Sequence, residues 1–270
     1  MKKWDIFIGI DRDSENLARA KAIIEEFTKG NNSIPDMHFI HGSFAQIDAY
    51  LTEFHISSIT GIMYDVGVSS IHFDEWERGF SFRLDWPLDM RFDRVGMEET
   101  ASHLIHSRSE RELFRILKDY GEEPKAFFIA KAIVDARKKS PITTTGELVQ
   151  IIEQSSFDKK SPVRVFQALR IELNQEFAHI EESLQKAVRL LAPNGRIAVI
   201  SFHSLEDRVV KQTFAQFEKD EIDDFTGQTK KPAVLKRVNK KPILPTEEEI
   251  QNNPRSRSAK LRIVQKQSDY

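Results

Sequence analysis

The chain has 270 residues, a formal net charge of -2 at pH 7, 40% hydrophobic residues and no cysteine. This length and composition are typical of one folded domain or of a domain with an insertion. The lack of cysteine excludes disulfides, thiolate catalysis and cysteine-ligated metal sites, and the charge near zero restricts any nucleic-acid contact to local basic patches.

Strand patterns alternate with helix patterns at the start of the chain and return near its end. The apolar runs that predict strands are Ile6–Ile10, Met37–Ile40, Ile59–Val66, Arg196–Phe202 and Leu261–Val264. Strands that alternate with helices at such spacing indicate βαβ units and a parallel sheet. No apolar run approaches the length of about 20 residues that spans a bilayer, and the start has no signal-peptide pattern, so we expect a cytoplasmic protein.

Helix starts are marked by residues that cap exposed backbone N–H groups. Asp13 or Ser14 is suited to begin a helix directly after the first strand, and Gly30 is suited to end it. Ser109 precedes an apolar helical pattern. Thr144 and Glu147 have the spacing of a capping box, in which each side chain bonds to the other residue's backbone. These signals predict a helix at each position.

The central part of the sequence, residues 76–170, has little strand pattern and several helix signals. We interpret it as an all-helical domain inserted into an α/β domain formed by residues 1–75 and 171–270. The apolar stripe along Val163–Leu191 predicts one long helix that leads the chain back to the sheet.

Acidic and small residues follow two of the predicted strands. Asp11 ends the first strand, where a carboxylate can accept hydrogen bonds from ribose hydroxyls or can simply cap a helix. Asp65 begins a second group with Gly67, Ser69 and Ser70, in which glycine permits close backbone approach and Asp65 can orient an amine. An ordinary strand-to-loop turn explains this second group about equally well.

Basic residues gather in two further stretches. Arginines alternate with aromatic residues between residues 76 and 93. This pattern suits contacts with RNA, and it also suits a salt-bridged junction between domains. The residues alone favour the junction. Residues 218–254 are polar and contain prolines, and we expect them to be irregular. The lysines and arginines of residues 230–262 suit either a solvated loop or a polyanion. His203 with Ser201 and Ser204 resembles the ingredients of a hydrolase, but no glycine-flanked nucleophile elbow accompanies them.

Together these segments resemble one family, the bacterial S-adenosylmethionine-dependent methyltransferases H that modify small-subunit ribosomal RNA. The matching motifs occur in order over nearly the whole chain, and ISFHSLEDR and NPRSRSAKLR are the most specific of them. The full set of matching motifs is IGIDRD (8–13), HGSF (41–44), DVGVSS (65–70), ERGFSF (77–82), PLDMRFD (87–93), YGEE (120–123), FQALRIELNQE (166–176), ISFHSLEDRVVK (200–211) and NPRSRSAKLR (253–262).

The resemblance implies a Rossmann-like S-adenosylmethionine-dependent methyltransferase sheet with an inserted all-helical domain. The activity that it implies is methylation of the N4 amine of a cytosine in 16S ribosomal RNA, in the decoding region of the small subunit. At the matching positions Asp11 would hold the ribose of the cofactor, Phe44 would lie against the adenine, and Asp65 would lie near the transferred methyl. His72 stands where the family usually has glutamine, and it is also expected to contact the cofactor.

For catalysis we predict Asp65, with the loop residues Ser69 and Ser70 as alternative contacts for the amine. The partner is expected to be 16S ribosomal RNA or the small subunit, with no DNA, membrane or metal involved. A non-catalytic RNA-binding or ribosome-assembly protein is the alternative function. The residues expected to contact RNA are Arg78, Arg83, Arg91, His203, Ser204, Lys236, Arg237, Arg255 and Arg257.

The start of the chain departs from the family pattern. Only ten residues precede Asp11, and the family's Gly-Gly-His-Ser loop and the strand before it have no counterpart among them. We expect an N-terminally shortened version, in which two strands of the sheet each lack a neighbour. Buried backbone groups without a partner cost about 1–3 kcal/mol each.

Overall fold

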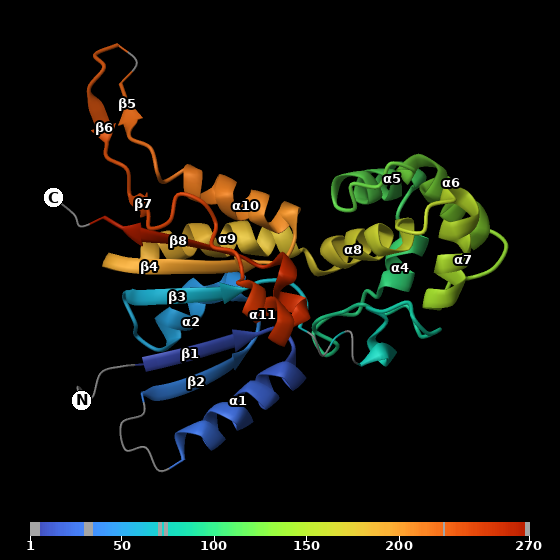
Figure 1. The fold of residues 1–270 in the computed structure, drawn as a ribbon, viewed down its shortest axis with the longest axis horizontal. Coiled ribbons are helices and arrows are strands. Elements are labelled where there is room, and N and C mark those ends of the chain that lie inside the picture. Colours follow the sequence, from blue (N-terminus) through green and yellow to red (C-terminus); the bar gives the residue numbers. More distant parts are fainter. Residues whose placement is uncertain (1–5, 30–34, 70–71, 73–74, 224, 268–270) are drawn as a thin grey trace. The chain divides into compact units, whose positions relative to one another are not determined.

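The computed structural model describes residues 6–29, 35–69, 72, 75–223 and 225–267, and the chain divides into two compact units. Unit 1 comprises residues 1–42 and 68–176, and unit 2 comprises residues 43–67 and 177–270. Figure 1 shows the helices and strands of both units.

Unit 1 begins with a βαβ element. Strands β1 (Ile6–Asp11) and β2 (Asp36–His41) pair in parallel, and helix α1 (Ser14–Thr28) connects them. The carboxylate of Asp13 accepts the first free backbone N–H groups of α1, which confirms the predicted strand and cap. Gly30, expected to close this helix, lies outside the described residues.

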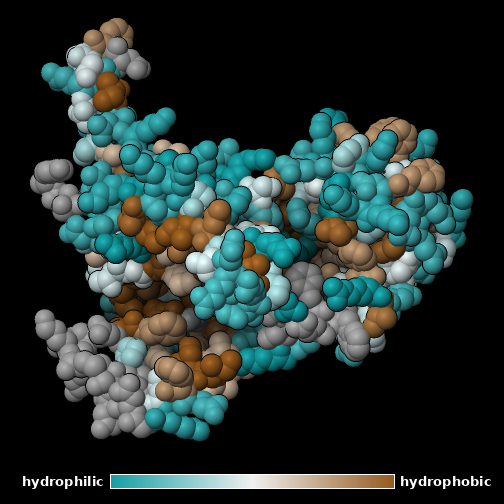
Figure 2. Space-filling model, in the orientation of Figure 1, coloured by the Kyte–Doolittle hydropathy of each residue, from teal (hydrophilic) through white to brown (hydrophobic). Residues whose placement is uncertain are grey.

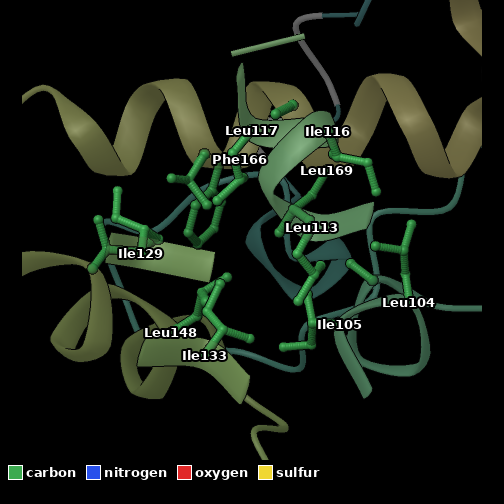
Figure 3. Packing of buried hydrophobic residues seen from close by; sticks show 14 of the residues in the cluster. Leu104, Ile105, Leu113, Ile116, Leu117, Ile129, Ile133, Leu148, Phe166 and Leu169 are labelled. Carbon is green, nitrogen blue, oxygen red and sulfur yellow. The ribbon is translucent and has the colours of Figure 1, made fainter. Parts of the chain in front are cut away.

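The rest of unit 1 is helical. Its helices are η2 (Trp76–Arg78), α4 (Ala101–Ser107), α5 (Glu110–Asp119), α6 (Ala126–Arg137), α7 (Thr145–Ser156) and α8 (Ser161–Asn174). Ser109 and Thr144 each form a capping box, which confirms both predicted helix starts. Figure 3 shows how α4 to α8 enclose one apolar core, in which each fully buried large side chain contributes about 1.5–3 kcal/mol.

Unit 2 contains a four-stranded sheet in the order β3-β4-β8-β7. Strand β4 pairs in parallel with β3 and in antiparallel fashion with β8, and β8 pairs in antiparallel fashion with β7. A short hairpin of β5 and β6 stands apart from this sheet. The strands are β3 (Ile59–Asp65), β4 (Leu191–Ser201), β5 (Glu221–Ile222), β6 (Thr229–Lys231), β7 (Leu235–Arg237) and β8 (Lys260–Lys266).

Helices α9 and α10 pack on this sheet through a second apolar core, which joins Ile180 and Leu184 of α9 and Phe214 of α10 to the buried side chains Tyr64 and Val199. Figure 1 shows these two helices beside the sheet. The helices of the unit are η1 (Phe44–Gln46), α2 (Ile47–Glu53), α9 (Glu176–Leu190), α10 (Ser204–Ala215), α11 (Glu247–Asn252) and η3 (Pro254–Ser258).

Two predictions need correction. The single helix predicted over Val163–Leu191 is two helices, because Gln175 adopts a left-handed conformation with φ 51° and ends α8. The stretch 218–254, predicted as irregular, contains β5, β6, β7 and α11. In the described part of the chain, no helix is both long enough and apolar enough to cross a membrane.

The compact units divide the chain differently from the predicted domains. Residues 1–42 group with the helical part of the chain rather than with β3 and β4. The physical reason is that β1 pairs with β2 and β3 pairs with β4, while no strand among the described residues joins the two sheets. Consequently β1 and β3 each have one side without a described strand partner.

Candidate functional sites

Asp11 lies at the carboxyl end of β1 in unit 1, as predicted. Its Oδ1 atom accepts the backbone N–H of Asp13 at 2.8 Å, which fixes the carboxylate at the strand exit. Burial raises the pKa of Asp11, and the hydrogen bond from Asp13 opposes this rise. A carboxylate at this position can accept hydrogen bonds from the hydroxyls of a ribose.

Asp13, His72 and Arg78 form a buried cluster in unit 1, and each is at most 3% exposed. His72 Nε2 lies 2.7 Å from Oδ2 of Asp13, and Arg78 donates to the same oxygen. Burial, the largest influence, tends to raise the pKa of Asp13, but the hydrogen bonds from His72 and Arg78 outweigh it and hold that pKa well below its usual range.

Both ring nitrogens of His72 form hydrogen bonds, and two phenylalanine rings pack against the ring. Its Nδ1 accepts the backbone N–H of Ser69 at 3.1 Å, so the proton is on Nε2 and is donated to Asp13. The rings of Phe80 and Phe92 lie on it, with centroids 4.8 and 5.1 Å away. The structure therefore uses both ring nitrogens within unit 1, whereas the sequence predicted a cofactor contact. Ser70 lies outside the described residues.

Arg78, which is predicted to contact RNA, forms several hydrogen bonds inside unit 1. Besides Asp13, its guanidinium donates to the backbone carbonyls of Arg91 and Phe92, both at 3.0 Å. Arg78 is therefore buried among these acceptors, and its contact with RNA stays a prediction. Arg91 forms a two-pronged ion pair with Asp89, at 2.7 and 2.9 Å.

Asn174 has an anchoring role that the sequence patterns did not indicate. It is completely buried, and its side-chain oxygen accepts the backbone N–H of Phe92 at 2.9 Å. Its amide nitrogen donates to the carbonyls of Met90 and Arg170. Asn174 thus fixes the conformation of the PLDMRFD motif from the last turn of α8.

Asp65 lies at the carboxyl end of β3 in unit 2, with its side chain open to solvent. Partial desolvation, followed by the negative charge of Glu206, raises the pKa of Asp65. Gly67 follows with φ +99°, and a Cβ on it would stand only 3.0 Å from Oε1 of Glu206. The backbone conformation therefore favours glycine at this strand exit, and a side chain there would also displace the carboxylate of Glu206.

Glu206 organises the start of α10 beside this strand exit. Its Oε2 atom accepts the backbone N–H groups of Phe202 and His203, while Oε1 lies 2.9 Å from His203 Nε2. His203 caps α10 through Nδ1, which accepts the N–H of Glu206. His203, predicted to contact RNA, is thus engaged in this turn, whereas Ser204 is exposed.

Phe44 lies at the start of η1 in unit 2. Its ring meets that of Tyr64 edge-on, with centroids 5.7 Å apart, and its carbonyl accepts from the Ser183 hydroxyl at 2.8 Å. Burial raises the pKa of Tyr64, and its hydroxyl lies 2.7 Å from that of Ser183. The aromatic ring predicted to lie against adenine is therefore positioned by the core of unit 2.

Most of the cations predicted to bind RNA are exposed. Arg83, Lys236, Arg255 and Arg257 are exposed. Arg237 is also exposed but forms a two-pronged ion pair with Glu218. Because Asp11 belongs to unit 1 and Asp65 to unit 2, their sharing of one cofactor site stays a prediction.

The sequence profile of the MraW methylase family matches residues 2–267. This protein belongs to that family. The chain is 42% identical over 271 residues to "Ribosomal RNA small subunit methyltransferase H" of Clostridioides difficile (strain 630), covering 97% of this chain and 85% of the relative. The protein of the same name from Caldicellulosiruptor saccharolyticus is 44% identical, with 96% and 84% covered.

A third relative of the same name, from Halothermothrix orenii, is 40% identical, with 97% of this chain and 84% of the relative covered. The family uses S-adenosylmethionine as the methyl donor. The resemblance read from the motifs is thereby confirmed. The α/β architecture of the chain agrees with the Rossmann-like methyltransferase fold that the resemblance implied.

Proposed function

We propose that this protein transfers the methyl group of S-adenosylmethionine to the N4 amine of a cytosine in 16S ribosomal RNA. The observation that carries the proposal is the family match over residues 2–267. The relatives are named as methyltransferases of small-subunit ribosomal RNA, and they are at least 40% identical to this chain. We propose a cytoplasmic location, where this substrate is found.

The residues present fit the cofactor by their chemistry. Asp11 would hold the ribose hydroxyls, and Phe44 would lie against the adenine ring. Gly67, with its positive φ, permits the turn of the backbone after β3, and the missing side chain leaves room there for Glu206. When bound, S-adenosylmethionine supplies the methyl group and the positive sulfur that makes it transferable.

Asp65 is our candidate for accepting the proton that the amine loses. A cytosine amine is a weak nucleophile because its lone pair is delocalised into the ring, so an acceptor at the amine aids attack. The raised pKa of Asp65 makes its carboxylate a stronger base than an ordinary aspartate. Glu206 contributes to this raised pKa from the neighbouring strand exit. Ser69 and Ser70 stay as the alternative contacts for the amine.

Exposed polar residues provide candidates for holding the RNA. The target base must leave its stack before it reaches a catalytic pocket. The hydroxyl of Ser204 is suited to contact the nucleic acid, and exposed cations are suited to its phosphates. Among the cations predicted to bind RNA, Arg83, Lys236, Arg237, Arg255 and Arg257 are exposed.

Transfer of a radiolabelled methyl group from S-adenosylmethionine to isolated small subunits tests the proposal. We expect label in one cytosine of 16S ribosomal RNA, located by nuclease digestion and mass spectrometry. Absence of label together with retained RNA binding would favour the alternative function, an RNA-binding protein without catalysis. Calorimetry with S-adenosylmethionine separates these outcomes by measuring whether the chain binds the cofactor. Asp11→Ala should weaken that binding about 10-fold or more if a charged hydrogen bond to the ribose is lost.

A further inference from the structure

A group of aromatic and cationic side chains lies on helices α5 and α6 of unit 1, in which Phe114 is half-buried and the other members are exposed. We call Phe114, Phe127, Phe128, Lys118 and Lys125 the aromatic–lysine surface. Phe127 and Phe128 are 52% and 56% exposed. The rings meet edge-on, with centroids 6.4 Å apart for Phe114 and Phe127 and 5.6 Å apart for Phe127 and Phe128.

Phe114 packs against the core, but the core does not require the exposed rings of Phe127 and Phe128. Helix α5 buries Leu113, Ile116 and Leu117, and α6 buries Ile129 and Ile133, so both helices already have complete apolar faces toward the core. In Figure 2, apolar side chains lie among hydrophilic ones on the part of the surface formed by this helical region. Adjacent large apolar side chains on a polar surface indicate a contact with another molecule.

Positive charge accompanies the rings. The ammonium group of Lys118 lies 5.6 Å from the ring centre of Phe114, and that of Lys125 lies 5.8 Å from that of Phe128. These distances are within the range of cation–π attraction. The two lysines therefore already occupy positions beside the faces of the aromatic rings.

Helical spacing adds further charges to the same face. Arg111 is three residues before Phe114, and Lys131 is four residues after Phe127, so both are neighbours of the rings. The acidic residues at such spacing are Glu110, four residues before Phe114, and Glu123, four residues before Phe127. Glu123 is buried and paired with Arg164 at 3.1 Å. Cations thus outnumber unpaired acids around the rings, which favours a polyanion as the ligand.

We propose that the aromatic–lysine surface stacks unpaired bases of ribosomal RNA on Phe127 and Phe128 while Lys118 and Lys125 bind the adjoining phosphates. Aromatic side chains next to cations recognise single-stranded RNA because every base presents a π-face and every linkage carries a charge. This inference rests on the proposed function, since the RNA is the methylation substrate. It adds a contact surface that is separate from the residues assigned to the cofactor.

The first test is the affinity of the full chain for a single-stranded fragment of 16S ribosomal RNA from the decoding region. Phe127→Ala and Phe128→Ala should each weaken binding about 5- to 100-fold, the effect of losing one stacked base. The same fragment annealed to its complement should show little difference between variants and wild type. Phe27→Ala on α1 is the control, because Phe27 is 90% exposed and lies outside the surface.

The second test uses the lysines and leaves the rings unchanged. Lys118→Gln and Lys125→Gln should each lower the slope of log affinity against log salt by about 0.7, the value for one phosphate contact on a single strand. Because both lysine side chains are exposed, the two variants should keep their fold, and circular dichroism checks that they do. Unchanged affinity and slope in all four folded variants would overturn the proposal.

Two further measurements separate this proposal from its rivals. Sedimentation of each variant tests self-association, and a change there without a change in RNA affinity would mean that the surface binds protein. Methyl transfer at saturating RNA should keep its kcat in the phenylalanine variants while KM rises. If the wild-type chain binds the RNA through this surface but methylates none, the proposed function fails and the binding surface stands.

Discussion

His72 Nε2 and Asp13 Oδ2 lie 2.7 Å apart in the interior of unit 1, where both side chains are almost completely buried. Asp13 also caps α1, and His72 accepts a backbone N–H from the loop that follows β3. A single carboxylate thus joins a helix start, a histidine and the guanidinium of Arg78. This junction holds together segments that are far apart in the sequence.

Replacing the buried carboxylate should make stability depend less on pH. Because the pKa of Asp13 is lowered in the folded protein, its stabilising contribution is complete above the ordinary aspartate pKa of about 3.9 and is lost as the pH falls through the lowered pKa. Asp13→Asn leaves Arg78 without its counter-charge and should cost about 3–5 kcal/mol at pH 7. Urea unfolding between pH 3 and pH 7 measures both effects.

The difference between wild type and Asp13→Asn should shrink at the acid end of that series. Asp36→Asn is the control, because the Asp36 side chain is 71% exposed. A constant difference across the whole pH range would contradict the assignment of the effect to ionised Asp13.

The anchoring role of Asn174 predicts a large loss of stability on truncation. Asn174→Ala leaves the backbone N–H of Phe92 and the carbonyl of Met90 without their partners, at about 1–3 kcal/mol for each buried group. The midpoint of chemical unfolding should fall accordingly. Asn252→Ala, at an exposed position of α11, should change it by less than about 0.5 kcal/mol. Equal midpoints for the two variants would refute the anchor.

The pair of Asp65 and Glu206 predicts a specific pH profile of methyl transfer. If Asp65 accepts the proton, kcat/KM should decrease as the pH falls through the raised pKa of its carboxyl, a midpoint above about 3.9. Asp65→Asn should lower kcat about 100-fold or more. Glu206→Gln removes a negative charge that raises this pKa and should move the midpoint to lower pH.

A merely structural role of Glu206 would lower activity at every pH without moving the midpoint. Glu247→Gln, at an exposed position of α11, is the matched control and should leave the profile unchanged. An unmoved midpoint in Glu206→Gln would show that the two carboxylates do not interact during the reaction.

Adjacent cations on β7 should contribute unequally to RNA binding. Lys236 is exposed, whereas the guanidinium of Arg237 is held by Glu218 and must break that ion pair to reach a phosphate. Lys236→Gln should therefore weaken RNA binding more than Arg237→Gln and lower its salt dependence by about one contact. Affinity titrations at several salt concentrations compare the two variants. A larger effect of Arg237→Gln would reverse this ranking.

Local signals predicted the elements well because their causes are local. The capping boxes at Ser109 and Thr144 depend on side chains three residues away, and the strand at Ile6 depends on an apolar run of a few residues. The long helix over Val163–Leu191 was predicted wrongly because the apolar stripe continues through Gln175. Only the backbone conformation of that residue separates α8 from α9.

The sequence by itself determined the family, through short motifs in a fixed order, and the element pattern, through periodicity and caps. Only the tertiary structure decided which charged residues of those motifs are buried. His72 and Arg78, whose ligand contacts stay predictions, lie against Asp13, from which they are separated by 59 and 65 residues in the sequence. Composition and spacing do not reveal such a partner, because an ion pair in the interior depends on which distant segments fold against each other.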